Sequence, residues 1–386
     1  MASPADPLPL VDYAPALRLA LLALVAALLP LSWWWLRQRG SERRARLAAL
    51  TALTLFLTFD LIVFGAFTRL TDSGLGCPDW PGCYGQASPL GAAPEIHAAQ
   101  TALPGGPVSF GKAWIEMIHR YLAMTVGVLI LVMAAVAWFD RWRGEGAAGL
   151  SPAWPTLTLA WVIVQGLFGR TTVTLKLFPA VVTLHLLGGL ILLVLLAAQH
   201  ARLRPRPMSL AAPARRALVL AAALLAAQVA LGGWVSSNYA VLACTDFPRC
   251  NGHWWPPMDF GSAFTLLRPL GGAADGGFVT QAALVAMHMA HRLFALLATG
   301  ALLWLAFALR REGSPASRRF AVALFTVTSM QVLSGLGNVV LGWPLAAALI
   351  HSAGAAALVL LLALLCLRAR SASPVERAAA AKPVPA

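Results

Sequence analysis

The sequence predicts an all-α polytopic membrane protein, built as two tandem four-helix bundles in a parallel pseudo-twofold repeat with one extra N-terminal helix. Hydrophobic residues make up 59% of the 386 residues and charged residues only 11%, and the mean hydropathy is +0.73. That composition is typical of chains with many membrane spans. The two halves also carry cysteine, glutamine, glycine and histidine at nearly the same spacings, which indicates a tandem duplication.

Nine segments are long and apolar enough to cross about 30 Å of hydrocarbon. They lie at 15–36, 47–68, 113–139, 154–175, 180–200, 216–237, 280–309, 319–340 and 345–367. The first is followed by a run of arginines and not by a small-residue cleavage site, so we interpret it as a retained helix. The other eight form two sets of four.

The predicted organisation follows from these sets. Residues 1–46 hold the extra helix and a basic linker, 47–200 the first bundle, 201–216 a second basic linker, 217–367 the second bundle, and 368–386 a disordered tail. Both bundles begin on the same side of the membrane. We therefore expect them to be related by an axis along the membrane normal.

The basic residues predict the orientation of the chain. Twenty of the 29 lysines and arginines fall in alternate connections and in the C-terminal tail, whereas the long loops 69–112 and 238–279 hold only four. The positive-inside rule then places these loops outside and the C-terminus in the cytoplasm. Because the charge follows the membrane topology, nucleic acid is not an expected partner.

Four of the five cysteines lie in the two external loops, where a disulfide can persist. Cys77 and Cys83 flank one turn-rich stretch, and Cys244 and Cys250 flank another. A disulfide within each loop is the simplest interpretation, although four cysteines allow three pairings. A structural role is favoured over a redox role. Cys366, near the cytoplasmic end of the last helix, is interpreted as a packing residue.

Four histidines occupy matched positions inside apolar segments, two in each half: His119, His185, His291 and His351. Two imidazoles at one depth on different helices of a bundle can ligate one heme iron from both sides. A single such histidine is more often a packing residue, but four at matched positions favour ligation. Zinc would need four closely grouped ligands, so heme fits better.

The two halves differ at one informative position, where Glu116 of the first half is replaced by His288. Glu116 shares a helix face with His119 and is a candidate proton carrier, or else a structural partner of Arg120 or Lys112. His288 is expected to contact a heme edge or a hydrogen-bond partner. Arg69 likewise becomes Ser236. The two sites should therefore do different jobs.

An arginine follows one histidine in each half, giving Arg120 and Arg292. Either guanidinium could pair with a heme propionate near the external face. The alternative is an arginine that extends to the membrane interface.

Together these residues resemble the heme A synthase family, in its bacterial branch with cysteine pairs in both external loops. The resemblance covers about 47 to 367 and is most specific at 68–77, 116–120 and 165–169 and in the four histidines. It implies oxidation of a methyl group of heme O to a formyl group, giving heme A for a cytochrome oxidase in a bacterial inner membrane with periplasmic long loops. Helix 15–36 exceeds the eight spans usual in the family.

The resemblance also implies a role for each histidine pair. His291 and His351 would hold heme b as cofactor, and His119 and His185 would hold substrate heme O beside the catalytic Glu116. Candidate partners are the enzyme that makes heme O (protoheme farnesyltransferase) and a second copy of the chain.

Two rival functions use similar features. A diheme b-type electron-transfer cytochrome would also need four helix histidines, but it would need no asymmetry between the halves. A transporter with parallel repeats predicts polar or helix-breaking residues at the bilayer midplane. Here midplane stretches such as 190–196 are apolar.

Overall fold

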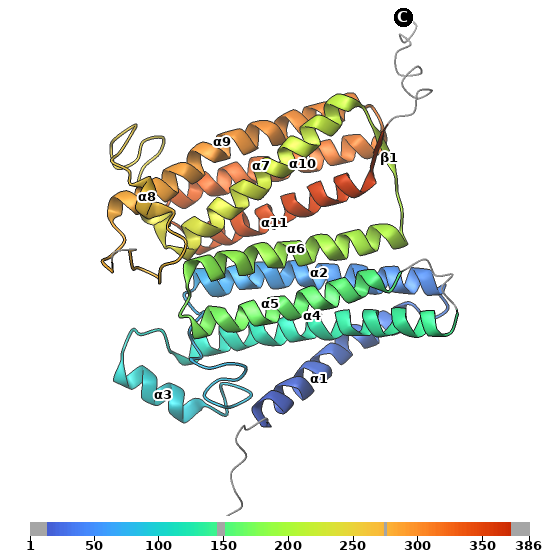
Figure 1. Ribbon diagram of the computed structural model, residues 1–386, viewed down its shortest axis with the longest axis horizontal. Coiled ribbons are helices and arrows are strands. Elements are labelled where there is room, and N and C mark those ends of the chain that lie inside the picture. The colour runs from blue at the N-terminus through green and yellow to red at the C-terminus, as the bar shows by residue number, and fades with distance from the viewer. Residues whose placement is uncertain (1–13, 145–150, 274–275, 372–386) are drawn as a thin grey trace, which may run out of the picture.

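The computed structural model describes residues 14–144, 151–273 and 276–371, and nine long helices dominate this part of the chain (Figure 1). Each predicted segment is a helix, and most helices extend a few residues beyond the predicted ends. Serine and threonine side chains cap the N-termini of three of them, which helps to explain the earlier starts of two. The bounds are α1 (Ala14–Arg37), α2 (Arg43–Leu70), α4 (Phe110–Trp142), α5 (Ala153–Thr174), α6 (Pro179–Leu203), α7 (Ala212–Ser237), α9 (Gln281–Arg311), α10 (Pro315–Val340) and α11 (Leu345–Arg368).

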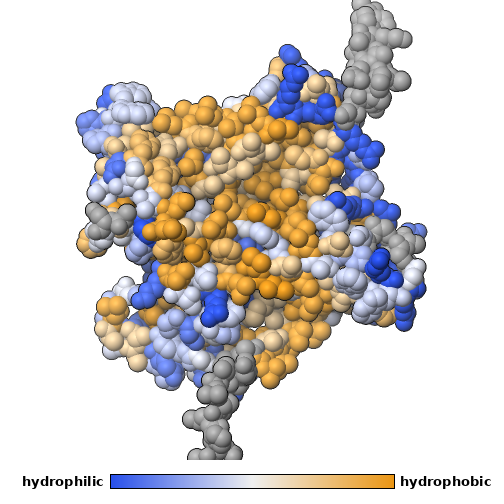
Figure 2. Space-filling view, viewed as in Figure 1, coloured by the Kyte–Doolittle hydropathy of each residue, from blue (hydrophilic) through white to orange (hydrophobic). Residues whose placement is uncertain are grey.

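Eight of these helices are long and apolar enough to cross a membrane, so the chain is a multi-pass membrane protein. An apolar surface separates two hydrophilic ends of the molecule (Figure 2). In the described part of the chain, α5 is the one predicted span whose sequence is not apolar enough to count as a membrane-crossing helix. Its threonines, together with Gln165 and Arg170, lower its hydropathy, yet it packs along α4 and α6 over its 22 residues.

The long helices form the two predicted bundles, α2–α4–α5–α6 and α7–α9–α10–α11 (Figure 1). Within each bundle the first and third helices both pack on the second and fourth. The second and fourth helices therefore lie diagonally opposite, with the bundle interior between them. The extra helix α1 packs outside, mainly on α4.

The bundles meet along α2 and α6 of the first half and α7 and α11 of the second. At one end of this interface Arg69 donates to the carbonyl of Ser236, and the Tyr239 hydroxyl donates to Asp72 at 2.5 Å. Both pairs are 167 residues apart in sequence, which is also the offset between the two cysteine pairs (244 − 77). Each residue thus contacts its own counterpart, as residues beside a pseudo-twofold axis must.

Short elements close the two ends of the bundles. The two long loops that carry the cysteine pairs hold α3 (Ala93–Ala102), α8 (Phe260–Ala263) and a 3₁₀ turn, η2 (Ala240–Leu242). At the opposite end β1 (Met208–Leu210) pairs in parallel with β2 (Ala369–Ser371), Met208 opposite Ala369. The linker expected at 201–216 is therefore shorter, since α6 and α7 extend into it.

The predicted disorder of the tail is wrong for its first residues. Arg368 is the last residue of α11, and 369–371 form β2, because β1 offers backbone hydrogen-bond partners that composition does not reveal. The rest of that tail, 372–386, lies outside the described residues.

Candidate functional site

Each of the four predicted histidines packs its imidazole against a glycine on the preceding long helix. The absence of a side chain on the glycine leaves space for the ring. A methyl group added to these glycines would lie 3.0 to 3.6 Å from the imidazole Cε1 atom, in the pairs Gly65–His119, Gly169–His185, Gly232–His291 and Gly335–His351. Both halves have therefore kept the glycine that packs against each histidine as well as the histidine itself.

The histidines of each half come from diagonally opposite helices. His119 lies on α4 and His185 on α6. His291 on α9 and His351 on α11 repeat this arrangement. The two histidines of each predicted pair therefore come from helices on opposite sides of one bundle interior, where both could bind a single heme.

The histidines of the second half are held by hydrogen bonds. Nδ1 of His351 donates to the carbonyl of Gln331 at 3.1 Å and lies 3.1 Å from the Ser334 hydroxyl. The side-chain amide nitrogen of Gln228 lies 3.0 Å from Nδ1 and 3.4 Å from Nε2 of His291 and donates to the backbone carbonyl of His291 at 3.2 Å. A histidine that ligates a metal generally uses one ring nitrogen for the metal and donates a hydrogen bond from the other, as Nδ1 of His351 does. These contacts fix the two rings in place.

The histidines of the first half lack this support. Nδ1 of His119 and Nδ1 of His185 are buried and have no hydrogen-bond partner among the residues that the structure describes, and the same holds for both polar atoms of the Gln165 amide. In the alignment of the two halves, Leu61 corresponds to Gln228 (offset 167) and Phe168 corresponds to Ser334 (offset 166). The orienting residues were missed from sequence, although these two apolar-for-polar exchanges were visible in the repeat.

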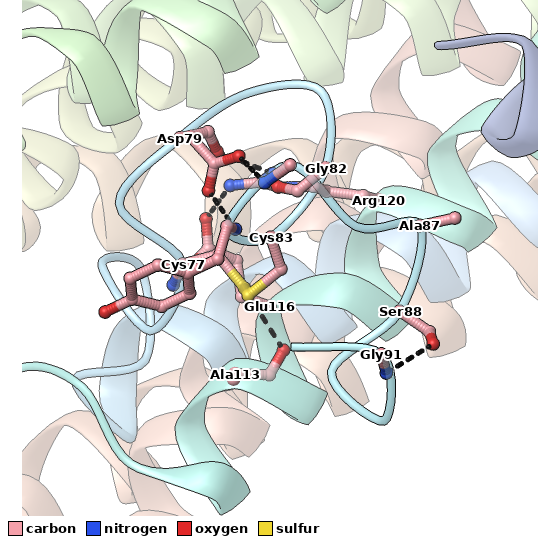
Figure 3. Close-up of a disulfide and its surroundings, with 12 residues drawn as sticks. Cys77, Asp79, Gly82, Cys83, Ala87, Ser88, Gly91, Ala113, Glu116 and Arg120 are labelled. Atoms are coloured by element: carbon pink, nitrogen blue, oxygen red, sulfur yellow. Dashed lines mark hydrogen bonds and ion pairs between the residues drawn. A yellow bond between two sulfur atoms is a disulfide. The ribbon is translucent and has the colours of Figure 1, made fainter. Parts of the chain in front are cut away.

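Glu116 lies next to the first disulfide loop, in the N-terminal part of α4 (Figure 3). Its Oε2 accepts from the backbone N–H of Cys77 at 2.8 Å, and its Oε1 accepts from Arg120. Cys77 is bonded to Cys83, so the disulfide loop and the carboxylate are one connected unit. Glu116 is only 4% exposed, which keeps the carboxylate away from bulk water.

Arg120 forms hydrogen bonds both to Glu116 and to the disulfide loop. Its Nη1 donates to the carbonyls of Asp79 at 2.9 Å, Pro81 at 3.2 Å and Gly82 at 2.5 Å, while Nη2 donates to Glu116. This differs from the predicted propionate contact, since the guanidinium already has an anionic partner. The alternative assignment of Glu116 as a partner of Arg120 therefore describes the observed contact.

The second half repeats the loop without the carboxylate. Cys244 is bonded to Cys250, and Nη1 of Arg292 donates to the carbonyls of Asp246 and Arg249, each at 3.0 Å. Within the described ranges, the buried Nε and Nη2 atoms of Arg292 have no hydrogen-bond partner. A buried cation with free donors needs an anion, and a heme propionate would meet that need. His288 occupies the position that corresponds to Glu116, and its side chain is buried.

The donor set suits heme iron better than a metal ion held by the protein alone. In the described ranges no three His, Cys, Asp or Glu side chains gather as a structural zinc site requires. Heme iron takes four nitrogens from its porphyrin and needs only two axial ligands. Two histidines across each bundle, with Arg292 beside one pair, match that need.

Comparison with known proteins bears on the whole chain. The family model described as cytochrome oxidase assembly protein (COX15-CtaA) matches residues 48–363. A heme A synthase of Shewanella oneidensis is 39% identical over 322 residues, which are 82% of this chain and 94% of that protein. Heme A synthases of Methylobacterium sp. (strain 4-46) and Rhizorhabdus wittichii are 31% and 29% identical, each over 84% of this chain and 93% of the relative. The chain therefore belongs to the cytochrome oxidase assembly protein family that includes the heme A synthases.

Proposed function

We propose that this protein is a heme A synthase, which oxidises a methyl group of heme O to a formyl group and so supplies heme A to a cytochrome oxidase. The names of its relatives support the reaction, and the unequal support of the two histidine pairs is the observation that carries the division of labour. One pair is held for a permanent group and the other is left adaptable for a group that must enter and leave.

The second bundle is the proposed cofactor site. His291 and His351 would hold heme b, with Gln228 and the Gln331 carbonyl orienting their rings. Arg292 would place its two free donors on a propionate. Bound heme b supplies one-electron oxidation and reduction. Fixed ligands suit that task, because a rigid site changes little between oxidation states.

The first bundle is the proposed substrate site. His119 and His185 would bind the iron of heme O, and the lack of a hydrogen-bond partner for their Nδ1 atoms among the described residues supports a less firmly held pair of ligands. A loosely held pair of ligands allows product heme A to depart. Glu116 lies three residues before His119 on the same helix face, at the edge of the space that the substrate would fill.

Glu116 is the proposed catalytic base. Written with water as the source of oxygen, R–CH3 + H2O gives R–CHO + 4 H⁺ + 4 e⁻, through an alcohol and a hydrate that loses water to give the aldehyde. The four electrons would leave one at a time through heme b. Protons must leave the carbon substituents at each stage, and a buried carboxylate beside the site can accept them. The Cys77 N–H and Arg120 hold this carboxylate in position.

The proposed setting is a bacterial inner membrane. The disulfide loops and the site ends of the helices would face the periplasm, and the ends that carry β1 and β2 would face the cytoplasm, because basic residues gather there. Heme O synthase would be a partner that delivers substrate, and a second copy of the chain would be another.

Co-expression with a source of heme O, followed by chromatography of the extracted hemes, tests the reaction. We expect heme A in cells that carry the wild-type chain. Heme O that accumulates without heme A would overturn the proposal, and a protein that carries heme b alone under these conditions would be the diheme electron-transfer cytochrome instead.

A further inference from the structure

A cavity of about 120 Å³ lies at the end of the molecule opposite the proposed heme sites, between the last turns of α6 and α11. Cationic side chains surround it: Arg204 and Arg206 follow α6, Arg368 ends α11, and Arg370 lies in β2, with His200 beside them. Leu364 and Leu367 supply an apolar wall. No heme ligand and no disulfide belongs to this site.

The duplication explains why so many cations meet here. An offset of 166, the one that relates His185 to His351, also relates Arg204 to Arg370. The basic end of α6 in one half and its counterpart after α11 in the other are brought together because α6 packs along α11 at the interface. The β1–β2 pairing then holds the two segments side by side.

These cations have no anionic partner in the described part of the chain. None of the four arginines forms a salt bridge there, and Arg368 instead stacks over the Phe320 ring at 5.4 Å. Like charges that share a cavity repel one another, and the repulsion is relieved when an anion binds among them. The cavity is therefore built for a negatively charged ligand.

We propose that this cavity binds the phosphate headgroup of an anionic phospholipid. The site lies where two membrane helices end, at the level expected for headgroups, and basic pockets between such helices on the cytoplasmic side are suited to anionic lipids. Guanidinium groups bind phosphate oxygens with paired hydrogen bonds. The leucine wall would contact the first part of an acyl chain, which a free phosphate ion lacks.

Native mass spectrometry of the purified full chain in detergent tests this site. The chain is titrated with phosphatidylglycerol, with phosphatidylcholine and with inorganic phosphate, and bound molecules are counted. The variant is Arg204→Gln with Arg370→Gln. The matched control is Arg310→Gln with Arg318→Gln, which removes two exposed arginines from the last turn of α9 and the first turn of α10, at the same end of the molecule. Retention of bound heme checks that each variant is folded.

We expect one phosphatidylglycerol to bind in preference to phosphatidylcholine and the Arg204/Arg370 variant to bind it roughly 30-fold more weakly, which is about 2 kcal/mol at 1.4 kcal/mol per tenfold. The control should bind as the wild type does. Equal loss in both variants would show diffuse attraction to basic residues and overturn the site. Displacement of the lipid by millimolar inorganic phosphate would assign the cavity to the free ion and overturn the lipid proposal.

Discussion

Replacing Gly232 with alanine should displace the cofactor heme without unfolding the protein. Gly232 lies in α7 where the imidazole of His291 crosses it, and an added Cβ would lie 3.0 Å from the ring Cε1. Ordinary contacts begin at 3.4 Å. The ring must therefore move by at least 0.4 Å (3.4 − 3.0). Metal–ligand distances tolerate only about 0.2 Å.

The size of the effect follows from this crowding. An extra methylene in a filled site costs about 1–3 kcal/mol. If this free energy is lost from heme binding, because the iron ligand is displaced, the affinity for heme drops roughly 5- to 150-fold. Alanine also favours the helix over glycine by about 1 kcal/mol, so the fold itself should not weaken.

The assay is heme absorbance per polypeptide after purification, with a dilution series to obtain the heme dissociation constant. Gly300→Ala is the matched control, because Gly300 lies inside α9 and its added methyl would meet nothing within 4 Å. Gly65→Ala makes the same 3.0 Å contact with His119. It should retain heme b and impair only the substrate site.

The reasoning would be refuted if Gly232→Ala kept the wild-type heme content and spectrum while folded. It would also be refuted if Gly65→Ala lost heme b as readily as Gly232→Ala, since the two halves would then not differ in function.

Three further predictions test other parts of the structure. Glu116→Gln should keep the fold and heme b but abolish heme A in extracted pigments, because an amide cannot accept the proton; normal heme A output would contradict the assignment. Gln228→Leu, which copies Leu61 of the other half, should weaken heme b binding about 10- to 100-fold, as losses of orienting partners do, and wild-type affinity would refute the orienting role. Burial, with the bond to Asp72, raises the pKa of Tyr239 to about 12. The protonated phenol is therefore the form that stabilises the interface, fully below about pH 10, and the contribution is lost as pH approaches 12. Ultraviolet titration of tyrosinate should show a group near pH 12 that Tyr239→Phe removes, and an unchanged titration would count against it.

The buried carboxylate and the disulfide loop depend on each other. Glu116 accepts from the Cys77 backbone, and Arg120 donates to both Glu116 and the loop carbonyls. The second half keeps the loop and the arginine but not the carboxylate, which leaves Arg292 with buried free donors. The replacement of Glu116 by His288 between the two halves therefore has two effects. It removes the proposed proton acceptor, and it leaves the neighbouring Arg292 without a carboxylate partner at this position.

The sequence alone determined the helices and the pairing of the histidines. Long apolar segments can only be helices in a membrane, since every backbone group must be bonded within its own segment. The duplication then paired His119 with His185 and His291 with His351 without any coordinates. All nine predicted segments are long helices, eight of them apolar enough to cross a membrane, while α5 carries more polar residues.

Only the tertiary structure decided how the two sites differ. Gln228 and His291 are 63 residues apart on different helices, and their contact depends on how each helix is rotated about its axis. Helices that are apolar on all sides give no periodic signal that fixes this rotation. The same holds for the contact of Arg120 with the loop and for β2, whose partner strand lies far away in sequence. Spacing could predict which residues belong to a site, while packing determined which of them are held in place.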